Sequence, residues 1–402
     1  MSLVVTGCFL LTGCGGGWQT TLAGPDGAET VISRATWRDL QAFVGEDSDI
    51  EKDSSLLLER VLYQHGYRLM DTLTLTDNDG TTQTFDWATV AGNARWQKSG
   101  ALSIDGETWH AARIEGSTSA LADAVTTRLV DIAPTAAAAL GLPAPAQATG
   151  DVLTTTQVSH VLLLFLDGFG YVRYTEARDA GLIPTLAALG EPAVGVSEYP
   201  PSTAIASAVI LTGAPPAVNK AEIRGTRATT VETLFDVAAQ AGRRTSAVEG
   251  DALAFNLRNA EIVLSGDRDG NGSTDDNVLA NALAVLDAGM PDILWVHFHG
   301  IDDAGHTYGP NTPEERATIT VVDAAVGEIL AMLPSDTLVL IFADHGMHAV
   351  QEEGRLGNHG HLIPRDMLVP VWEVVKESRS PFVIHNSQPA IHYYYAAQRV
   401  SQ

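Results

Sequence analysis

Seven side chains with oxygen or nitrogen donors stand out between residues 167 and 359, most of them directly after an apolar run: Asp167, Thr203, Asp302, His306, Asp344, His345 and His359. Zinc at a catalytic site takes nitrogen and oxygen ligands and keeps one position open for substrate. Two metals close together can hold the attacking and the leaving oxygen of an in-line displacement at phosphorus. Three carboxylates, three imidazoles and one hydroxyl are the donors that two such metals need, with Thr203 doubling as the nucleophile.

The sharpest of these motifs pairs a carboxylate with an imidazole four residues later. Asp302 and His306 can face one ion, and Gly305 allows a tight turn between them just after a buried strand. Asp344 and His345 are adjacent, so they can point at different ions if the two metals lie about 4 Å apart. His359 follows in a glycine-rich loop. A single loop histidine is a weak signal, and it is a candidate ligand here because it follows the other motifs in order.

Asp167 and Thr203 are weaker signals when each is taken alone. Asp167-Gly168 ends an apolar run, and such a pair is often only a turn. Thr203 precedes an apolar stretch, where backbone N–H groups at a helix start favour anions. The alternative for Thr203 is an ordinary helix N-cap.

The order of apolar runs and helical patterns predicts the fold of the second half. Continuous apolar strands that alternate with helices indicate a mostly parallel sheet covered on both faces, and ligands bind beyond the carboxyl ends of its strands. Thr312-Pro313-Glu314-Glu315 predicts a capped helix that continues to about Leu333. Strands are expected at 161–166, 245–248, 262–264, 293–298 and 337–342, and further helices at 231–241 and 276–288.

Three segments are expected along the chain. Residues 1–14 are a short apolar segment that ends in Leu11-Thr12-Gly13-Cys14, which resembles the lipobox of bacterial lipoproteins; the alternative is a chance match in an unstructured N-terminus. Residues 15–117 are expected to form a small α+β accessory domain with hairpins, and residues 118–402 the catalytic domain. The lipobox predicts a lipid-anchored protein on the periplasmic or extracellular face of a bacterial cell envelope.

The composition limits the partners. The 402 residues carry a formal net charge of -25, which argues against nucleic acid because such partners require a basic surface. It also argues against docking on anionic lipid through charge, so the membrane is expected to be reached only through the lipid anchor. The two-metal motifs indicate a small-molecule phosphoester as the substrate. Cys8 and Cys14 are the only cysteines, and lipidation of Cys14 with removal of Cys8 would leave no thiol for catalysis.

The motifs together resemble the alkaline phosphatase superfamily, and most closely its type I phosphodiesterase/nucleotide pyrophosphatase branch. The resemblance covers about residues 157–370 and rests on five motifs in family order: Asp167-Gly168, Thr203 before Thr212-Gly213, Asp302 to Pro310, Asp344 to Met347, and His359-Gly360. It implies an α/β fold of three αβα layers around a mostly parallel sheet. It also implies that one metal takes Asp302, His306 and His359, while the other takes Asp167, Asp344, His345 and Thr203.

The chain departs from the branch at two places. An asparagine that often follows the nucleophile by three residues is replaced by Ala206, which weakens the assignment to nucleotide pyrophosphatases. The segment 130–150 resembles one that usually follows the last metal histidine, but here it precedes the first strand. Either the core is circularly permuted, or an alanine-rich helix mimics that segment. The sulfatase signature is absent around Thr203, so a formylglycine sulfatase is not expected.

An acidic loop and several additional histidines provide further candidate sites. Oxygens at alternate positions with a glycine at the sixth can wrap a hard cation, which makes this loop either a calcium site or an acidic turn. Four histidines flank the metal motifs and could orient ligands or simply fill polar positions, and His361 is the main competitor of His359 as a ligand. The loop residues are Asp267, Asp269, Asn271 and Asp275, and the flanking histidines are His297, His299, His348 and His361.

The leading hypothesis is a metal-dependent hydrolase of phosphate mono- or diesters. Thr203 attacks phosphorus in line, and water then hydrolyses the phosphothreonine. Two Zn²⁺ ions are expected from the histidine-rich set, with Mn²⁺ as the alternative, and Ca²⁺ in the acidic loop. The alternatives are a non-catalytic metal-binding lipoprotein and a transferase that passes a phosphoryl or phosphoethanolamine group to an alcohol.

Overall fold

The computed structural model describes residues 17–37, 55–222, 225–376 and 383–384. The lipobox-like Leu11–Cys14 and Cys8 lie outside these residues. No helix within the described ranges is long and apolar enough to cross a membrane.

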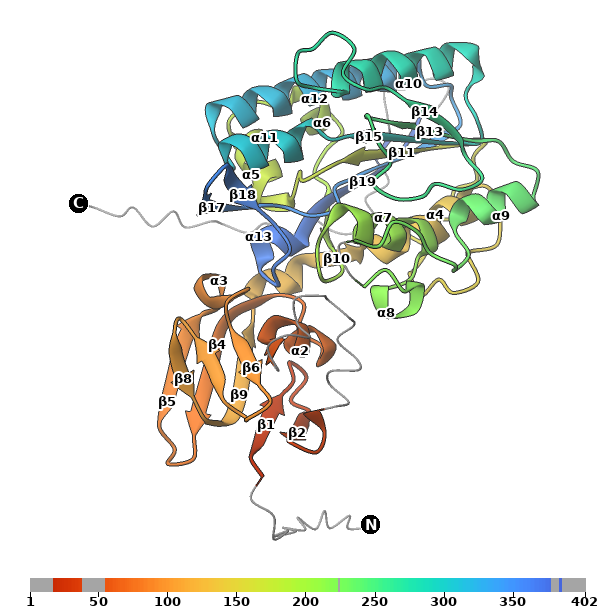
Figure 1. The fold of residues 1–402 in the computed structure, drawn as a ribbon. Helices are drawn as coiled ribbons and strands as arrows, with labels where there is room; N and C mark the ends of the chain where they lie inside the picture. Colours follow the sequence, from red (N-terminus) through yellow and green to blue (C-terminus); the bar gives the residue numbers. More distant parts are fainter. Residues whose placement is uncertain (1–16, 38–54, 223–224, 377–382, 385–402) are drawn as a thin grey trace. The chain divides into compact units, whose positions relative to one another are not determined.

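The chain divides into two compact units (Figure 1). Unit 1 comprises Met1–Ala122 together with His361–Pro364, and unit 2 comprises Asp123–Gly360 and Arg365–Gln402. The main chain therefore leaves unit 2 for four residues immediately after His359-Gly360 and then returns. Within unit 1 these four residues are held by Glu59, whose carboxylate accepts the Leu362 N–H at 3.0 Å, and by the Trp87 indole, which donates to the Leu362 carbonyl at 2.7 Å.

Unit 1 is an α+β module with two sheets. Antiparallel pairing of β4 with β5 across Asp77–Thr81 gives the hairpin that alternating Leu73 and Leu75 predict. Asp105-Gly106 turns between β7 and β8 with both residues at positive φ, as a tight hairpin requires. The five-stranded sheet has the order β2(Glu29–Ser33), β1(Gln19–Ala23), β9(Ala111–Thr118), β4(Met70–Asp77), β5(Thr82–Asp86); the four-stranded sheet has the order β3(Ser55–Leu57), β6(Arg95–Gln97), β7(Leu102–Ile104), β8(Glu107–Trp109); the helices are α2(Leu58–Gln64), α3(Trp87–Val90) and the 3₁₀ helix η1(Ala120–Ala124).

Unit 2 is built on one nine-stranded sheet, which confirms the predicted α/β class. The pairs β11–β15, β11–β16, β13–β15 and β13–β14 are parallel, whereas β19 runs antiparallel to β12 and β16. Every described residue of β15 and β16 is buried, as expected for strands covered on both faces. The strand order is β10(Val125–Arg128), β12(Ala193–Val196), β19(Leu368–Lys376), β16(Thr337–Phe342), β11(His160–Leu166), β15(Ile293–Phe298), β13(Thr245–Glu249), β14(Glu261–Leu264), with β20(Val383–Ile384) paired to β19.

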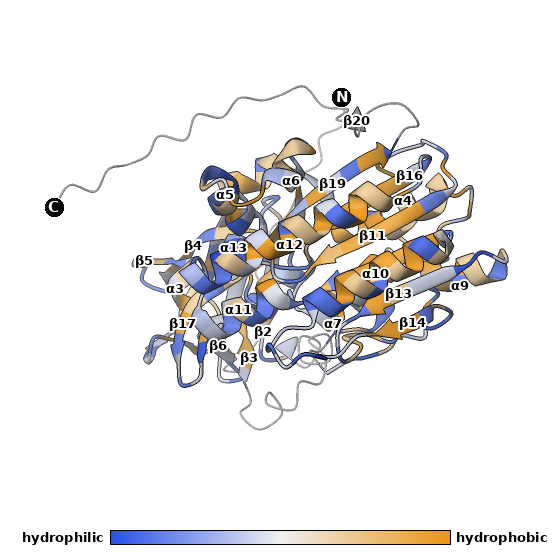
Figure 2. Cartoon of the chain, turned by 90° about the horizontal axis from the view of Figure 1, so that it is seen from above, coloured by the Kyte–Doolittle hydropathy of each residue, from blue (hydrophilic) through white to orange (hydrophobic). Residues whose placement is uncertain are grey.

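Helices cover both faces of this sheet and complete three layers (Figures 1 and 2). The central strands β11, β16 and β19 are predominantly apolar, and their side chains form the core with those of the flanking helices. One layer contains α5(Tyr171–Asp179), α6(Pro184–Ala188), α10(Asp275–Gly289), α11(Gly300–Tyr308) and α12(Pro313–Met332); the other contains α4(Ile132–Ala139), α7(Thr203–Thr212), α8(Pro216–Asn219) and α9(Leu234–Gln240). The remaining elements are the 3₁₀ helix η2(Leu129–Asp131), the hairpin β17(His348–Glu352)–β18(Arg355–Asn358) and α13(Pro364–Met367).

The segment 130–150 that suggested a permuted core contributes α4 to unit 2, and β10 and η2 lie at its start. Strand β10 pairs with β12, which separates it from β19 in the sheet, and α4 packs against α7, α9 and β16. This part of the chain therefore supplies an edge strand and a covering helix of unit 2. The circular permutation itself stays a prediction.

Helix α9 begins at Leu234, three residues later than the apolar pattern from Val231 predicts. Thr233 is the reason, because it forms a capping box with Asp236: its hydroxyl accepts the Asp236 N–H at 3.2 Å, and the Asp236 carboxylate accepts the Thr233 N–H at 2.8 Å. Arg258 donates to the same carboxylate at 2.7 Å. Burial alone would raise the pKa of Asp236, but the hydrogen bonds from Arg258 and Thr233 lower it to about 2.

We expect Asp236→Asn to lower the free energy of unfolding of unit 2 by about 2 kcal/mol at pH 7, from the pKa shift and the loss of the cap. Because the folded-state pKa lies below the ordinary value, this contribution is complete above about pH 4 and disappears as the pH falls toward 2. Urea unfolding at pH 7 and pH 3 measures the difference. The exposed Asp287 in α10 provides the matched control, and an equal effect of Asp287→Asn would contradict the role given to Asp236.

Candidate metal centre

Two neighbouring strands deliver Asp167 and Asp344 to the carboxyl edge of the sheet. Asp167 follows β11 directly, and Asp344 follows β16 by two residues. These two strands are neighbours and parallel, so their carboxyl ends meet at one edge, where both carboxylates are almost completely buried. Gly168 (φ 69°) turns the chain away from β11, and its N–H donates to Asp344 Oδ1 at 3.1 Å. The turn therefore links the two carboxylates.

Asp302 and His306 lie on a helix, which corrects the expected tight turn. Helix α11 runs through the motif from Gly300 to Tyr308, so Gly305 is helical. The four-residue spacing places both side chains on one helix face, with His306 Nε2 3.0 Å from Asp302 Oδ2. Gly305 is needed for a different reason, since a Cβ there would lie 2.5 Å from the Met347 sulfur.

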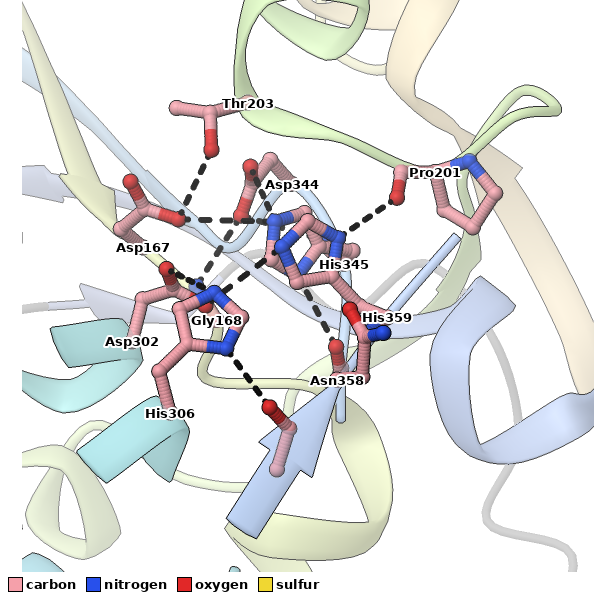
Figure 3. A network of polar contacts seen from close by, with 12 residues as sticks. Asp167, Gly168, Pro201, Thr203, Asp302, His306, Asp344, His345, Asn358 and His359 are labelled. Atoms are coloured by element: carbon pink, nitrogen blue, oxygen red, sulfur yellow. Dashed lines mark hydrogen bonds and ion pairs between the residues drawn. The ribbon is translucent and has the colours of Figure 1, made fainter. Parts of the chain in front are cut away.

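The three histidines of the set all bind a backbone carbonyl through Nδ1. His306 lies 2.8 Å from the Gly357 oxygen, His345 lies 2.9 Å from the Gly346 oxygen, and His359 lies 2.9 Å from the Pro201 oxygen. A carbonyl only accepts, so each Nδ1 carries the hydrogen and each Nε2 presents a lone pair. Figure 3 shows the three rings directed toward the carboxylates in this way. This is the orientation that metal-ligating histidines require.

The Nε2 atoms and carboxylate oxygens converge on a small volume. Asp302, His306 and His359 each bring one ligand atom within 4.8 Å of the others, and so do Asp167, Asp302 and His345. His345 Nε2 lies 3.1 Å from Asp344 Oδ2 and 3.6 Å from Asp167 Oδ1. The rings of His345 and His359 stack with centroids 3.6 Å apart, so the two groups are adjacent. Asp302 belongs to both groups, an arrangement that the sequence did not indicate.

The side chains fit a metal centre because several of their atoms lack a donor. Asp302 Oδ1, Asp344 Oδ2 and His345 Nε2 are buried and have no hydrogen-bond partner. Buried acceptors that face one another repel, and such groups are normally paired or coordinate a cation. The remaining acceptor atoms of Asp344 are satisfied, since Oδ1 accepts the N–H groups of Gly168 and His345. The unpaired atoms are thus the ones that point into the cluster.

The two neighbouring carboxylates have opposite pKa shifts. Burial would raise the pKa of Asp167, but hydrogen bonds from His297 and His299 and the charges of His297 and His345 hold it well below its ordinary range. Burial and the negative charge of Asp167 raise the pKa of Asp344 well above its ordinary value. A cation would reverse the shift at Asp344, so binding at this site should release a proton.

Thr203 is the first residue of α7 and points its hydroxyl at this cluster. Its Oγ1 lies 3.4 Å from Asp167 Oδ1, as drawn in Figure 3. Ser202 is the N-cap residue, and its side chain makes no capping hydrogen bond. The structure therefore brings all seven sequence-derived residues together, with Thr203 beside the carboxylate and not in the N-cap position that was its alternative reading.

Two glycines allow the backbones around these residues to pack closely. A Cβ on Gly346 would lie 2.0 Å from the Arg365 carbonyl oxygen, and one on Gly170 would lie 2.3 Å from the Gly346 Cα. The turns after Asp167 and after His345 therefore press against each other. This close approach explains why both motifs contain glycine shortly after the donor residue.

The sequence did not reveal a buried glutamate behind the cluster. Glu249 ends β13 and contacts both His297 and His299, which were considered only as flanking histidines. Asp275, expected in the calcium loop, instead accepts the His299 and Gly300 N–H groups at 3.0 Å and so holds the start of α11. The Arg355 guanidinium, on β18, lies beside the His306 ring, with a nitrogen 2.6 Å from Nε2. An acidic residue at the end of a buried strand was the available signal for Glu249.

The acidic loop, His348 and His361 have hydrogen-bond partners outside the seven residues. In the acidic loop, Asp267 accepts the N–H groups of Gly270 and Gly272, and Asn271 accepts that of Ser273. Within the described residues, the groups of side chains that could hold a metal ion include none from this loop. The calcium site stays a prediction. His361 lies in unit 1 with its Nδ1 3.2 Å from Glu59, and His348 Nδ1 lies 2.9 Å from Asp366.

The sequence of unit 2 matches a known family. The model of the type I phosphodiesterase / nucleotide pyrophosphatase family matches residues 224–399, which include Asp302, His306, Asp344, His345 and His359. The match covers less than half of the chain, and Asp167 and Thr203 lie before the matched region. It agrees with the resemblance to the type I phosphodiesterase/nucleotide pyrophosphatase branch that the motifs indicate.

Curated relatives share a short segment with this chain. A human protein named GPI ethanolamine phosphate transferase 3, catalytic subunit, is 30% identical over 101 residues, which are 25% of this chain and 8% of that protein. GPI ethanolamine phosphate transferase 3 of Schizosaccharomyces pombe is 36% identical over 69 residues, which are 17% of this chain and 7% of that protein. The chain thus spans less than a tenth of the length of these relatives.

Solved structures show a more distant likeness. Phosphonoacetate hydrolase from Sinorhizobium meliloti, in complex with phosphonoacetate, is 18% identical, with a TM-score of 0.41 over 52% of this chain and 59% of that one. Murine ectonucleotide pyrophosphatase / phosphodiesterase 5 is 16% identical, with a TM-score of 0.37 over 48% of this chain and 59% of that one.

Proposed function

We propose that this protein hydrolyses small phosphoric esters at a two-metal centre, with Thr203 as the nucleophile. The observation that carries the proposal is the position of the Thr203 hydroxyl, 3.4 Å from Asp167 Oδ1. Three imidazoles lie beside it, and each binds a backbone carbonyl through Nδ1, which turns its Nε2 toward the carboxylates. The match of residues 224–399 to the type I phosphodiesterase / nucleotide pyrophosphatase family supports the same proposal.

The residues around Thr203 provide for an anionic substrate and a covalent step. Helix α7 has ten residues and begins at Thr203, so its N-terminal amides and dipole favour a phosphate at this point. The Asp167 carboxylate accepts the hydrogen bond of the Thr203 hydroxyl and polarises it. Thr203 Oγ1 then loses its proton and forms a bond to phosphorus as the bond to the leaving oxygen breaks. The displaced alkoxide takes up a proton and departs as the alcohol. Water attacks the phosphothreonine in the second step, which releases phosphate and restores the hydroxyl.

Asp302, His306 and His359 would hold one metal, and Asp167, Asp344, His345 and Thr203 the other. When bound, two metals would stabilise the charge on the attacking and leaving oxygens and lower the pKa of the threonine hydroxyl. A set of imidazoles and carboxylates favours Zn²⁺, with Mn²⁺ as the second candidate.

We place the protein on the outer side of a bacterial membrane through a lipid on Cys14. The support for this placement is the Leu11-Thr12-Gly13-Cys14 sequence. Lipidation can be tested by mass spectrometry of the protein purified from a bacterial host, with Cys14→Ser as the control. An unmodified Cys14 within an uncleaved chain would contradict it.

A second candidate is transfer of a phosphoryl or phosphoethanolamine group to an alcohol. The names of the curated relatives favour it, because the matched proteins are ethanolamine phosphate transferases. The first chemical step would be the same, and an alcohol would replace water in the second. The same phosphothreonine therefore serves either outcome.

Aryl phosphate mono- and diesters assayed with zinc-loaded protein test the hydrolase proposal. We expect turnover that a chelator abolishes and Zn²⁺ restores. Adding ethanolamine or glycerol as acceptor separates the candidates, since a hydrolase releases one equivalent of phosphate from a monoester per alcohol released, whereas a transferase forms a new ester. No turnover of any ester by protein that binds two metals would contradict both.

A further inference from the structure

Three buried polar side chains, Glu249, His297 and Asp167, are hydrogen-bonded in series. His297 is fully buried on β15, with Nε2 3.1 Å from Asp167 Oδ2 and Nδ1 2.9 Å from Glu249 Oε2. Glu249 is 1% exposed at the end of β13. We call Glu249, His297 and Asp167 the relay. A carboxylate this deep in a sheet is costly to bury unless its oxygens are bonded, so the relay calls for an explanation beyond packing.

The sheet register brings these residues together. Strands β13 and β15 pair in parallel with Val248 beside Val296, which places Glu249 next to His297. Strands β15 and β11 pair with His297 beside Phe165, and Asp167 follows two residues later. The relay therefore depends on three neighbouring strands of the rigid core and not on a loop.

Both ends of the relay are fixed in orientation. The Trp295 indole donates to Glu249 Oε1 at 2.8 Å, which leaves Oε2 for His297 and for His299 Nε2 at 3.2 Å. The Phe165 ring stacks on His297 with centroids 3.8 Å apart and planes 3° from parallel. His297 can therefore neither rotate nor tilt away from the two carboxylates.

This anchoring divides the two oxygens of Asp167 between different tasks. Oδ2 is tied to His297, so Oδ1 is the oxygen that faces Thr203 at 3.4 Å and His345 Nε2 at 3.6 Å. Loss of His297 would let the carboxylate rotate about its Cβ–Cγ bond. A rotated Oδ1 could then contact neither the metal nor Thr203 correctly, because the atoms of such sites must stay within about 0.5 Å of their productive positions.

We propose that Glu249 and His297 are positioning residues, which aim Asp167 Oδ1 at the second metal and at Thr203. The proposal deepens the proposed function and rests on it for the role of Thr203. Asp167, His297 and His299 could also be read as a site for a third cation, since their ligand atoms lie within 4.8 Å of one another. The hydrogen bonds favour positioning, because both His297 nitrogens already have carboxylate partners.

The test compares Glu249→Gln, His297→Leu and His297→Gln with wild type. Metal content is measured by mass spectrometry and metal affinity by chelator competition, alongside kcat and KM on an aryl phosphate. We expect Glu249→Gln and His297→Leu to weaken the binding of one metal by about 10- to 100-fold. We expect kcat to fall by a similar factor and KM to change less than about threefold, because substrate contacts are unchanged. His297→Gln, which keeps a donor, should recover part of both losses.

Asp323→Asn is the matched control for Glu249→Gln. Asp323 is a carboxylate of similar burial that accepts the Thr185 and Leu186 N–H groups at the start of α6, away from the seven residues. Its amide variant should lower the melting temperature and leave metal affinity and kcat unchanged.

Two results would overturn the proposal. One is metal affinity and kcat within about twofold of wild type in both Glu249→Gln and His297→Leu. The other is three metals per chain in wild type and two in His297→Leu, which would make His297 a ligand. If wild type binds two metals but hydrolyses no ester, the proposed function fails while metal affinity still decides the positioning role.

Discussion

Thr203→Ala should nearly abolish ester hydrolysis while leaving the fold intact and the metal held by Asp302, His306 and His359 in place. The variant removes the oxygen that, in the proposed function, forms the covalent bond to phosphorus, so we expect kcat to fall at least about 1,000-fold with little change in KM. Thr203→Ser keeps a hydroxyl at the start of α7 and should retain activity within about tenfold of wild type. Steady-state rates on aryl phosphates, together with the melting temperature and metal content of each variant, provide the measurement.

Ser202→Ala is the matched control for this experiment. Ser202 precedes Thr203, is buried, and its Oγ has no hydrogen-bond partner. Removing this neighbouring hydroxyl should change kcat less than about threefold. Acid quenching of wild type during turnover should trap phosphate on Thr203, detectable by peptide mass spectrometry. Equal turnover by wild type and Thr203→Ala would refute the assignment of the nucleophile.

The sequence predicts the strands of unit 2 well because their physics is local. Runs such as 293–298 and 337–342 are apolar throughout and match the observed strands at both ends. A strand that is buried on both faces is apolar at every position, so it can be recognised from its own residues without knowing which strands pair with it. The capped start of α12 at Pro313 is equally local, since Thr312 accepts the Glu315 N–H across one turn.

Other features depend on contacts that no local pattern records. Gly305 suggested a turn between Asp302 and His306, yet it lies inside α11, where the Met347 sulfur occupies the place of a side chain. Glu249 belongs to the site only because β13 lies beside β15, a pairing across about fifty residues of sequence. Its neighbours along the chain gave no indication of this.

The choice between His359 and His361 shows the same limit, because both stand in one short glycine-containing loop. The structure separates them: His359 shares a ligand group with Asp302 and His306, whereas His361 lies in unit 1 beside Glu59. Orientation distinguishes them as well. The Pro201 carbonyl binds His359 Nδ1 at 2.9 Å, which directs Nε2 toward the carboxylates.

His359→Ala should therefore remove one of two bound metals, whereas His361→Ala should keep both. A metal contributes several kcal/mol to stabilising charge at phosphorus, and each 1.36 kcal/mol is tenfold in rate, so we expect His359→Ala to lose about 1,000-fold or more in kcat. His361→Ala provides the matched control, with kcat expected within about tenfold of wild type. Metal counting after dialysis against trace Zn²⁺ and rates on an aryl phosphate decide the comparison. If His361→Ala lost the metal and His359→Ala did not, the ligand assignment of the first site would be wrong, and with it the convergence of Asp302, His306 and His359 on one ion.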